Sequence, residues 1–251
     1  MLPIELRQLV SEHCNARGLS TGTATFPPGS VLPYHVHYCG EAITVLRGEA
    51  QVTVEGRKYR LRTLDCIFVP AGLAHRVANS SNAPFVVHTA FAAESPDRVL
   101  VAGPTEEEDR ALGAPRRDEA ELVMRFEHAE MYPLADGTRF FDLFAARFGS
   151  VGICGGYGEF LPGTSLACHV HKFDESITII TGEAVCQVQG RKHVLSGYDT
   201  AFVPEGRPHR FLNNSNDLMA MIWVYGGSEP ERTLLSTGYC TGSLEWSGSA
   251  V

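Results

Sequence analysis

The sequence lacks any apolar run of about 18 residues, the length that a membrane-spanning helix needs, so no membrane span is expected. Its seven cysteines include no C-x-x-C pair, and their odd number predicts reduced thiols rather than a disulfide framework. The first twelve residues have no long apolar core, which predicts no secretion signal and a cytoplasmic protein. Basic residues are also scarce, 21 against 29 acidic ones, and this net charge of −8 argues against nucleic acid or an anionic membrane as a partner.

The composition that remains is that of a folded, turn-rich protein. Hydrophobic residues make up 44% of the chain, enough for a globular core. The 25 glycines and 14 prolines favour many turns and therefore a β-rich fold. A length of 251 residues suits one large domain or two small ones.

An internal repeat decides between these alternatives. A single shift of 134 positions, without a gap, aligns a series of short motifs: His35-Val36-His37 with His169-Val170-His171, Glu41 with Glu175, Gly48-Glu49-Ala50 with Gly182-Glu183-Ala184, Phe68-Val69-Pro70 with Phe202-Val203-Pro204, and His75 with His209. Two domains are therefore predicted, at 1–103 and 135–251. An acidic linker at 104–134 is expected to contain a short helix between Ala111 and Leu122.

Each repeat consists of short alternating or β-branched runs between turn signals, which predicts an all-β sandwich or barrel. Successive side chains of a strand point to opposite faces, so both imidazoles of a His-x-His motif point the same way. A glutamate four residues later and a third histidine from another strand complete a set of three nitrogens and one oxygen. Such a set suits divalent Fe, Mn, Ni, Co, Cu or Zn. The sequence predicts two such metal sites: His35, His37, Glu41 and His75, and His169, His171, Glu175 and His209.

These spacings resemble the two signature motifs of the cupin superfamily. The first motif is Gly29-x5-His35-x-His37-x3-Glu41-x6-Gly48, the second is Pro70-x-Gly72-x2-His75-x3-Asn79, and both recur 134 positions later. The resemblance implies a bicupin: two tandem double-stranded β-helix (jelly-roll) barrels joined by an acidic, partly helical linker. One departure is that Leu64 and Tyr198 stand where the family usually has glycine, which puts a local turn in question.

The resemblance leaves the reaction open, because cupins carry several chemistries. The first hypothesis is a dioxygenase-type enzyme acting on a small oxygenated metabolite that chelates the metal. The alternatives are a Mn-dependent hydrolase, lyase, decarboxylase or isomerase, and a non-enzymatic small-molecule binding protein. Iron or manganese, one ion per barrel, is the favoured cofactor. No dinucleotide loop is expected, because the glycine-rich run at 152–158 precedes a strand rather than a helix.

Beyond the ligands, the sequence identifies no proton-transfer or other catalytic residue. The remaining expectations concern side chains near the motifs and the assembly. Arg76 and Arg210 should face away from the metal, and His88 should lie in the core or at the rim. Tyr34, Tyr38 and Lys172 should cover the barrel mouths. A homodimer is the assembly that the resemblance implies.

Overall fold

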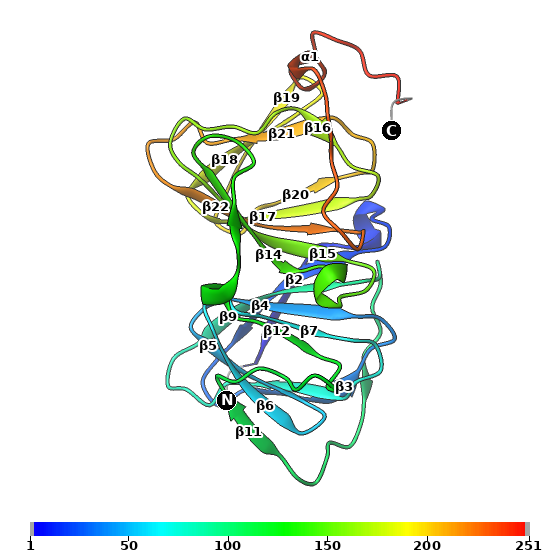
Figure 1. Ribbon diagram of the computed structural model, residues 1–251, viewed down its shortest axis with the longest axis vertical. Coiled ribbons are helices and arrows are strands. Elements are labelled where there is room, and N and C mark those ends of the chain that lie inside the picture. The colour runs from blue at the N-terminus through cyan, green and yellow to red at the C-terminus, as the bar shows by residue number, and fades with distance from the viewer. Residues whose placement is uncertain (1–2, 249–251) are drawn as a thin grey trace. The chain divides into compact units, whose positions relative to one another are not determined.

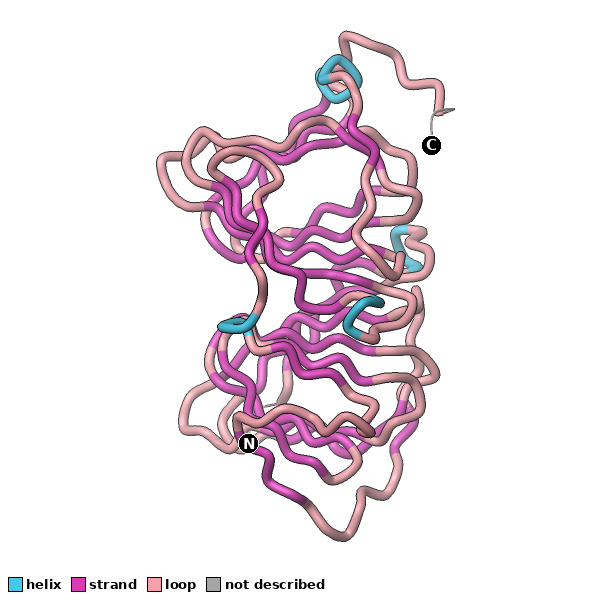
Figure 2. The backbone as a smooth tube through the Cα atoms, viewed as in Figure 1, coloured by secondary structure: helices cyan, strands magenta, loops and turns pink. Residues whose placement is uncertain are grey.

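The computed structural model describes residues 3–248, and its chain divides into two compact units (Figure 1). The first unit runs to Ala129 and includes Leu143–Ile153; the second includes Glu130–Asp142 and the chain from Cys154 onward. Met1 and Val251, the outer ends of the predicted domains, lie outside the described residues. In each unit two mainly antiparallel sheets face each other, and helices are few and short (Figure 2). The predicted all-β fold of two tandem jelly-roll barrels is thereby confirmed.

The first unit consists of two six-stranded sheets, ordered β1-β2-β9-β4-β7-β12 and β10-β3-β8-β5-β6-β11. Its elements are β1 (Glu5–Val10), the 3-10 helix η1 (Glu12–Cys14), β2 (Ser20–Phe26), β3 (Val31–Val36), β4 (Glu41–Arg47), β5 (Glu49–Val54), β6 (Arg57–Arg62), β7 (Cys66–Val69), β8 (His75–Ala78), β9 (Phe85–Phe91), β10 (Val99–Leu100), β11 (Glu108–Ala111), β12 (Leu122–Met124) and the 3-10 helix η2 (Phe126–His128).

The second unit repeats this plan with sheets ordered β13-β14-β15-β22-β17-β20 and β19-β18-β21-β16-β23. The remaining elements of the chain are β13 (Met131–Tyr132), β14 (Thr138–Phe144), the 3-10 helix η3 (Ala146–Phe148), β15 (Cys154–Phe160), β16 (His169–Val170), β17 (Glu175–Thr181), β18 (Glu183–Val188), β19 (Arg191–Ser196), β20 (Thr200–Val203), β21 (His209–Leu212), β22 (Met219–Tyr225), β23 (Thr233–Leu234) and the helix α1 (Thr237–Thr241). Of the helices in the described part of the chain, none has the length and apolar character needed to cross a membrane.

The core of each barrel follows from strand periodicity. In the first unit Ile43 and Val45 of β4 alternate with residues of the opposite face and are fully buried. They share a cluster with Phe26 and Phe85, whose rings stack with centroids 4.6 Å apart. In the second unit Ile177 and Ile179 occupy the corresponding buried positions of β17.

The stretch between the barrels differs from its prediction. Residues 111–122 form the end of β11, turns and the start of β12, and the helical part of the 104–134 linker is instead the 3-10 helix η2 at Phe126–His128. β11 pairs in parallel with β6, and β12 pairs antiparallel with β7, so sheet hydrogen bonds outweigh the weak helical preference of this sequence. We call residues 104–126 the strap, because they lie along the edge of the first barrel.

The cysteines also depart from expectation. Cys168 and Cys240 form a disulfide, so the prediction that all seven thiols are reduced is wrong for this pair. Cys14, Cys39, Cys66, Cys154 and Cys186 form no disulfide within residues 3–248. The two bonded residues are 72 positions apart, and only the fold, which places α1 beside the start of β16, brings them together.

The turns at Leu64 and Tyr198 keep their shape despite the missing glycine. Both residues have left-handed backbones, with φ of 69° and 70°. The side chains of Asp65 and Asp199 accept hydrogen bonds from the backbone amides three residues earlier, at 3.0 and 3.1 Å. These bonds help to hold a conformation that a non-glycine residue adopts at some energetic cost.

Candidate metal centres

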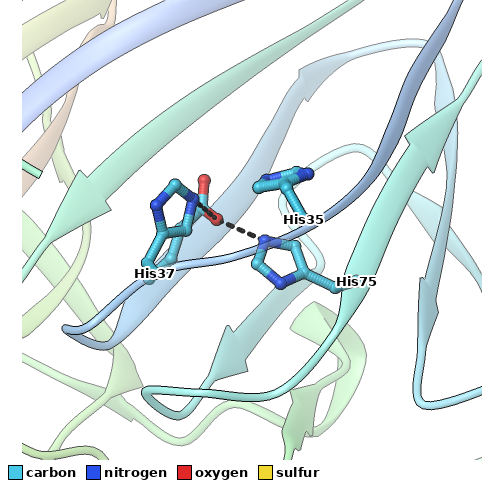
Figure 3. Close-up of side chains that lie close together, drawn as sticks. His35, His37 and His75 are labelled. Carbon is cyan, nitrogen blue, oxygen red and sulfur yellow. Dashed lines mark hydrogen bonds and ion pairs between the residues drawn. The ribbon is translucent and has the colours of Figure 1, made fainter. Parts of the chain in front are cut away.

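The first barrel brings its four predicted ligands into one buried cluster. His35 lies near the end of β3, His37 follows that strand, and Glu41 and His75 begin β4 and β8. One potential ligand atom from each residue lies within 4.8 Å of those of the other three. Figure 3 shows the three imidazoles turned toward one another around a carboxylate. This is the same-face placement that the His-x-His spacing predicts.

Hydrogen bonds fix the orientation of each ring. Nδ1 of His35 lies 2.7 Å from the carbonyl of Pro33, and Nδ1 of His75 lies 2.9 Å from that of Leu73. Nδ1 of His37 contacts the carbonyl oxygen of Asp97. Because a carbonyl only accepts, each Nδ1 carries a proton, and each Nε2 is the ring atom left to face Glu41 or a bound metal.

The charges in this cluster suit a cation. Burial lowers the pKa of His35 to about 4, so its ring is neutral at pH 7. Burial also opposes ionisation of Glu41, but hydrogen bonds from His37 and His75 outweigh it and hold the pKa of the carboxyl well below its usual range. Oε2 of Glu41 lies 2.9 Å from Nε2 of His75 and 3.4 Å from Nε2 of His37. A buried carboxylate therefore faces imidazole nitrogens.

The second barrel repeats this geometry. Oε2 of Glu175 lies 2.7 Å from Nε2 of His209 and 3.4 Å from Nε2 of His171. Burial lowers the pKa of His169 well below its ordinary value. The three Nδ1 atoms again face backbone carbonyls, those of Ala167, Glu231 and Arg207 at 2.8, 2.5 and 2.9 Å. All eight predicted ligands thus lie in two matching clusters.

Several polar atoms at the cluster centres lack a well-aligned hydrogen-bond partner among the described residues. They are the Nε2 atoms of His37, His171 and His209 and Oε2 of Glu175, and all are buried. Such atoms are costly unless something else binds them. Three imidazole nitrogens and one carboxylate oxygen form a donor set that fits a divalent transition metal, so the residues fit the implied ion.

The space beside the two clusters differs. In the first barrel a cavity of about 190 Å³ reaches Glu41 and is lined by Thr89, Phe91, Arg98 and Gly22 of β2, among others. In the second barrel Trp223 stands at the position of Thr89, and Tyr225 at that of Phe91. The Trp223 and Tyr225 rings pack 4.8 Å apart, and Tyr225 lies 4.4 Å from the ring of His171.

A third aromatic ring adds to this packing. Phe173, at the position of Cys39 in the first barrel, stacks on His171 with ring centroids 5.4 Å apart. Burial raises the pKa of Tyr225 well above its ordinary value, in keeping with a closed environment. Aromatic rings therefore fill the second barrel at the positions where the first has its cavity. The free space beside the second cluster is instead a pocket lined by His171, Lys172 and residues 230–233.

Residues outside the ligand sets are mostly engaged elsewhere. Arg76 pairs with Glu107 of the strap at 2.7 Å, and Arg210 with Gln187 at 2.8 Å, so both face away from the metal clusters as predicted. The hydroxyl of Tyr34 donates to Glu107, and that of Tyr38 to the carbonyl of Ser95. His88 is buried, as expected for a core residue.

The sequence analysis did not identify Arg98 and Arg232 as site residues. Each directly follows the residue whose backbone carbonyl holds the ring of His37 or His171. Arg98 lines the cavity of the first barrel, and Arg232 lines a pocket beside His171 and Lys172 in the second. The repeat alignment contains a signal for them, because Arg98 and Arg232 are 134 positions apart like the ligands. The role of these two arginines could not be inferred from the sequence, because it depends on the chain returning to the barrel mouth at these residues.

Comparisons with known proteins agree with this arrangement. A family model described as a cupin domain matches residues 22–91 and again 156–225, more than half of the chain. An uncharacterised protein of Methanocaldococcus jannaschii is 30% identical over 69 residues, which is 27% of this chain. The chain covers only about half, 55%, of that relative.

Solved structures of two-barrel proteins are similar over 92% of this chain. One is Bacillus subtilis oxalate decarboxylase, from work on its Mn(II) centres, with a TM-score of 0.74, 16% identity and 77% of that chain covered. Another is the formate complex of Lactobacillus farciminis oxalate decarboxylase, with a TM-score of 0.74, 14% identity and 83% covered. At such identities the likeness concerns the fold alone.

Proposed function

Because this chain belongs to the cupin family and carries two cupin domains, we propose that it is a metal-dependent enzyme that removes carbon dioxide from a small carboxylic acid. Its reacting site is the cavity of the first barrel. This proposal takes up the decarboxylase alternative, which the fold neighbours favour over the dioxygenase hypothesis.

The observation that carries the proposal is the cavity that joins Glu41 to Arg98. With a volume of about 190 Å³ it has room for only a small molecule. Ile43, Val87 and Phe91 give it apolar walls, and the low polarity of these walls strengthens electrostatic contacts inside. A small anion entering this space meets the two arginines that line it, Arg7 and Arg98, and the metal cluster at Glu41.

The first cluster would hold the ion through His35, His37, Glu41 and His75. When bound, a divalent ion supplies Lewis-acid stabilisation of negative charge on the oxygens of a chelating acid. The protein's own contribution is orientation, because each imidazole is fixed by the hydrogen bond of its Nδ1.

Arg98 binds the carboxylate of the substrate in this scheme. Its planar guanidinium suits a carboxylate and stays charged at any physiological pH. The backbone carbonyl just before it orients His37, so the position of the arginine is coupled to that of a ligand. In decarboxylation the bond between the carboxylate carbon and its neighbour breaks, CO2 leaves with the carboxylate oxygens, and the electron pair left behind takes a proton. Among the described residues that line the cavity, Glu41 is the sole carboxylate and is a ligand, so water supplies this proton.

The test begins with untagged protein reconstituted with Mn(II) or, without oxygen, with Fe(II). Oxalate and short 2-oxo acids are added, and CO2 release and O2 uptake are followed together by membrane-inlet mass spectrometry. We expect metal-dependent CO2 release without matching O2 uptake. O2 consumed in step with the substrate would instead support the dioxygenase hypothesis. Full metal content without either gas change would support a binding protein.

Two matched variants locate the reaction. Arg98→Gln should raise KM at least about tenfold, the loss of one charge-assisted contact, while its counterpart Arg232→Gln in the second barrel should leave KM within about twofold. Equal effects of both variants would contradict the assignment of the reaction to the first barrel.

A further inference from the structure

The two barrels differ at one pair of sheet edges. In the first barrel β6 and β7 are covered by strands of the strap, β11 on β6 and β12 on β7. In the second barrel the equivalent strands β19 and β20 are the last strands of their sheets within residues 3–248 (Figure 1). An edge strand left in this state offers unpaired backbone donors and acceptors to another chain.

The side chains at these edges show the same contrast. Tyr59 and Leu61 of β6 are fully buried in the core of the first barrel, and the hydroxyl of Tyr59 donates to Glu121 of the strap at 2.7 Å. Their equivalents in β19 are the exposed His193 and the half-buried Leu195, and Val194 between them is 61% exposed. A pocket of about 650 Å³ lies here, between the edges of β19 and β20, and Phe202 is among its apolar lining residues. The surface is therefore hollowed, partly apolar and open.

The charged side chains around this pocket indicate what kind of ligand could fill it. In the first barrel the acidic strap meets basic side chains: Glu121 accepts from Arg57 at 2.6 Å, and Glu107 lies 3.5 Å from Lys58. The same basic pair recurs in the second barrel as Arg191 and Lys192, both exposed. Arg207 adds a third cation at the pocket, where its Nη1 donates to Gln189. The second barrel thus keeps the positive charges that bind the strap in the first.

We propose that the face formed by β19 and β20 binds an extended acidic segment of a partner polypeptide, which pairs with β19 as β11 pairs with β6. A peptide satisfies all three features at once. Its backbone pairs with the strand edge, its apolar side chains cover Val194 and Phe202, and its carboxylates meet Arg191 and Lys192. A small anion would use the cations alone and leave the edge and the apolar surface uncovered.

The strap itself provides the probe, because its sequence already fits such a face. A fluorescent synthetic peptide with the sequence of residues 104–126 is titrated into the full-length protein and followed by anisotropy. A scrambled peptide of identical composition is the control for charge alone. We expect saturable binding of the first peptide, binding at least about tenfold weaker for the scrambled one, and loss of affinity as salt rises.

Variants and hydrogen exchange then locate the bound peptide. The double variant R191E/K192E should weaken binding at least about tenfold, whereas R47E/R62E, an equal change of charge at two exposed arginines of the first barrel, should not. Hydrogen exchange of the unaltered protein should slow at residues 191–196 when the peptide is added. This second measurement does not depend on the folding of any variant.

Several outcomes would overturn the proposal. They are no binding, equal binding of the scrambled peptide, equal effects of the two double variants, or unchanged exchange in β19. Sedimentation velocity tests another occupant. If the protein alone forms a dimer that R191E/K192E disrupts, the face joins two copies of this chain and not an acidic partner segment.

Discussion

The two barrels hold the same four ligand positions each but differ in what lies beside and around them. The first has free space next to its cluster, where the second has Trp223, Tyr225 and Phe173. The first is closed along β6 and β7 by the strap, whereas the second leaves β19 and β20 as edges. The difference teaches that duplication preserved the metal geometry, while the interior and the edge of each copy changed independently.

This comparison suggests a division of roles. A cluster with a cavity can admit a substrate, and a cluster packed by aromatic rings is better suited to holding its barrel together, since a bound metal contributes folding free energy. The following predictions test that division, beginning with the largest expected effect.

Removing one ligand from each barrel should separate the two roles. His37→Ala and His171→Ala should each remove about one equivalent of metal, measured by plasma mass spectrometry. Only His37→Ala should lower kcat/KM by about a thousandfold, because it removes several kcal/mol of Lewis-acid stabilisation from the reacting site. A larger loss of activity with His171→Ala would reverse the roles assigned to the barrels.

These ligand positions could be predicted because their geometry is local. In each copy, two histidines and a glutamate lie within seven residues, and strand periodicity alone turns both imidazoles to one side. Arg98 was missed, because its place at the cavity depends on a segment that returns to the barrel mouth from outside the motif. The strap and the disulfide between Cys168 and Cys240 were missed for a related reason, since both rest on contacts between distant positions.

The strap should be an integral part of the first barrel. Arg125 is buried and donates to Asp65 at 2.8 Å and to the carbonyl of Arg60 at 2.7 Å. Arg125→Met would leave the Asp65 carboxylate buried without its cation and should lower the free energy of unfolding by about 3 kcal/mol, measured in urea. The counterpart of Asp65 in the second barrel is Asp199, which is exposed. Asp199→Asn should therefore lower the free energy of unfolding by less than about 1 kcal/mol. Similar losses in both variants would show that the strap adds little to the first barrel.

The cavity of the first barrel can be filled by introducing the side chain that the second barrel has at the equivalent position. Thr89→Trp copies Trp223, and both positions face a glycine on the neighbouring strand: Gly22 pairs with Thr89, and Gly156 with Trp223. The indole should fill the cavity and lower kcat/KM about a hundredfold by excluding substrate, while metal content stays unchanged. The near-isosteric Thr89→Val should retain most activity. Full activity in Thr89→Trp would place the substrate elsewhere.

A fall in pH should destabilise the first barrel through His88, a residue that the second barrel lacks. His88 is buried, and burial lowers its pKa to about 4, whereas the second barrel has Ile222 at the same position. Because the unfolded state has the higher histidine pKa, near 6.5, it binds more protons than the folded state below that pH. The contribution of this residue to stability is thus intact above about pH 6.5 and is lost as pH falls toward 4.

From this shift we expect about 2 kcal/mol of stability to be lost between pH 7.5 and pH 5 through His88 alone. His88→Ile should abolish that part of the loss, so that urea unfolding of the variant varies less with pH than that of the unaltered protein. The buried ligands His35 and His169 have lowered pKa values in both barrels and remain present in both proteins, so their contribution cancels in the comparison. An identical pH dependence in the two proteins would mean that the His88 ring takes up its proton in the folded barrel as readily as in the unfolded chain.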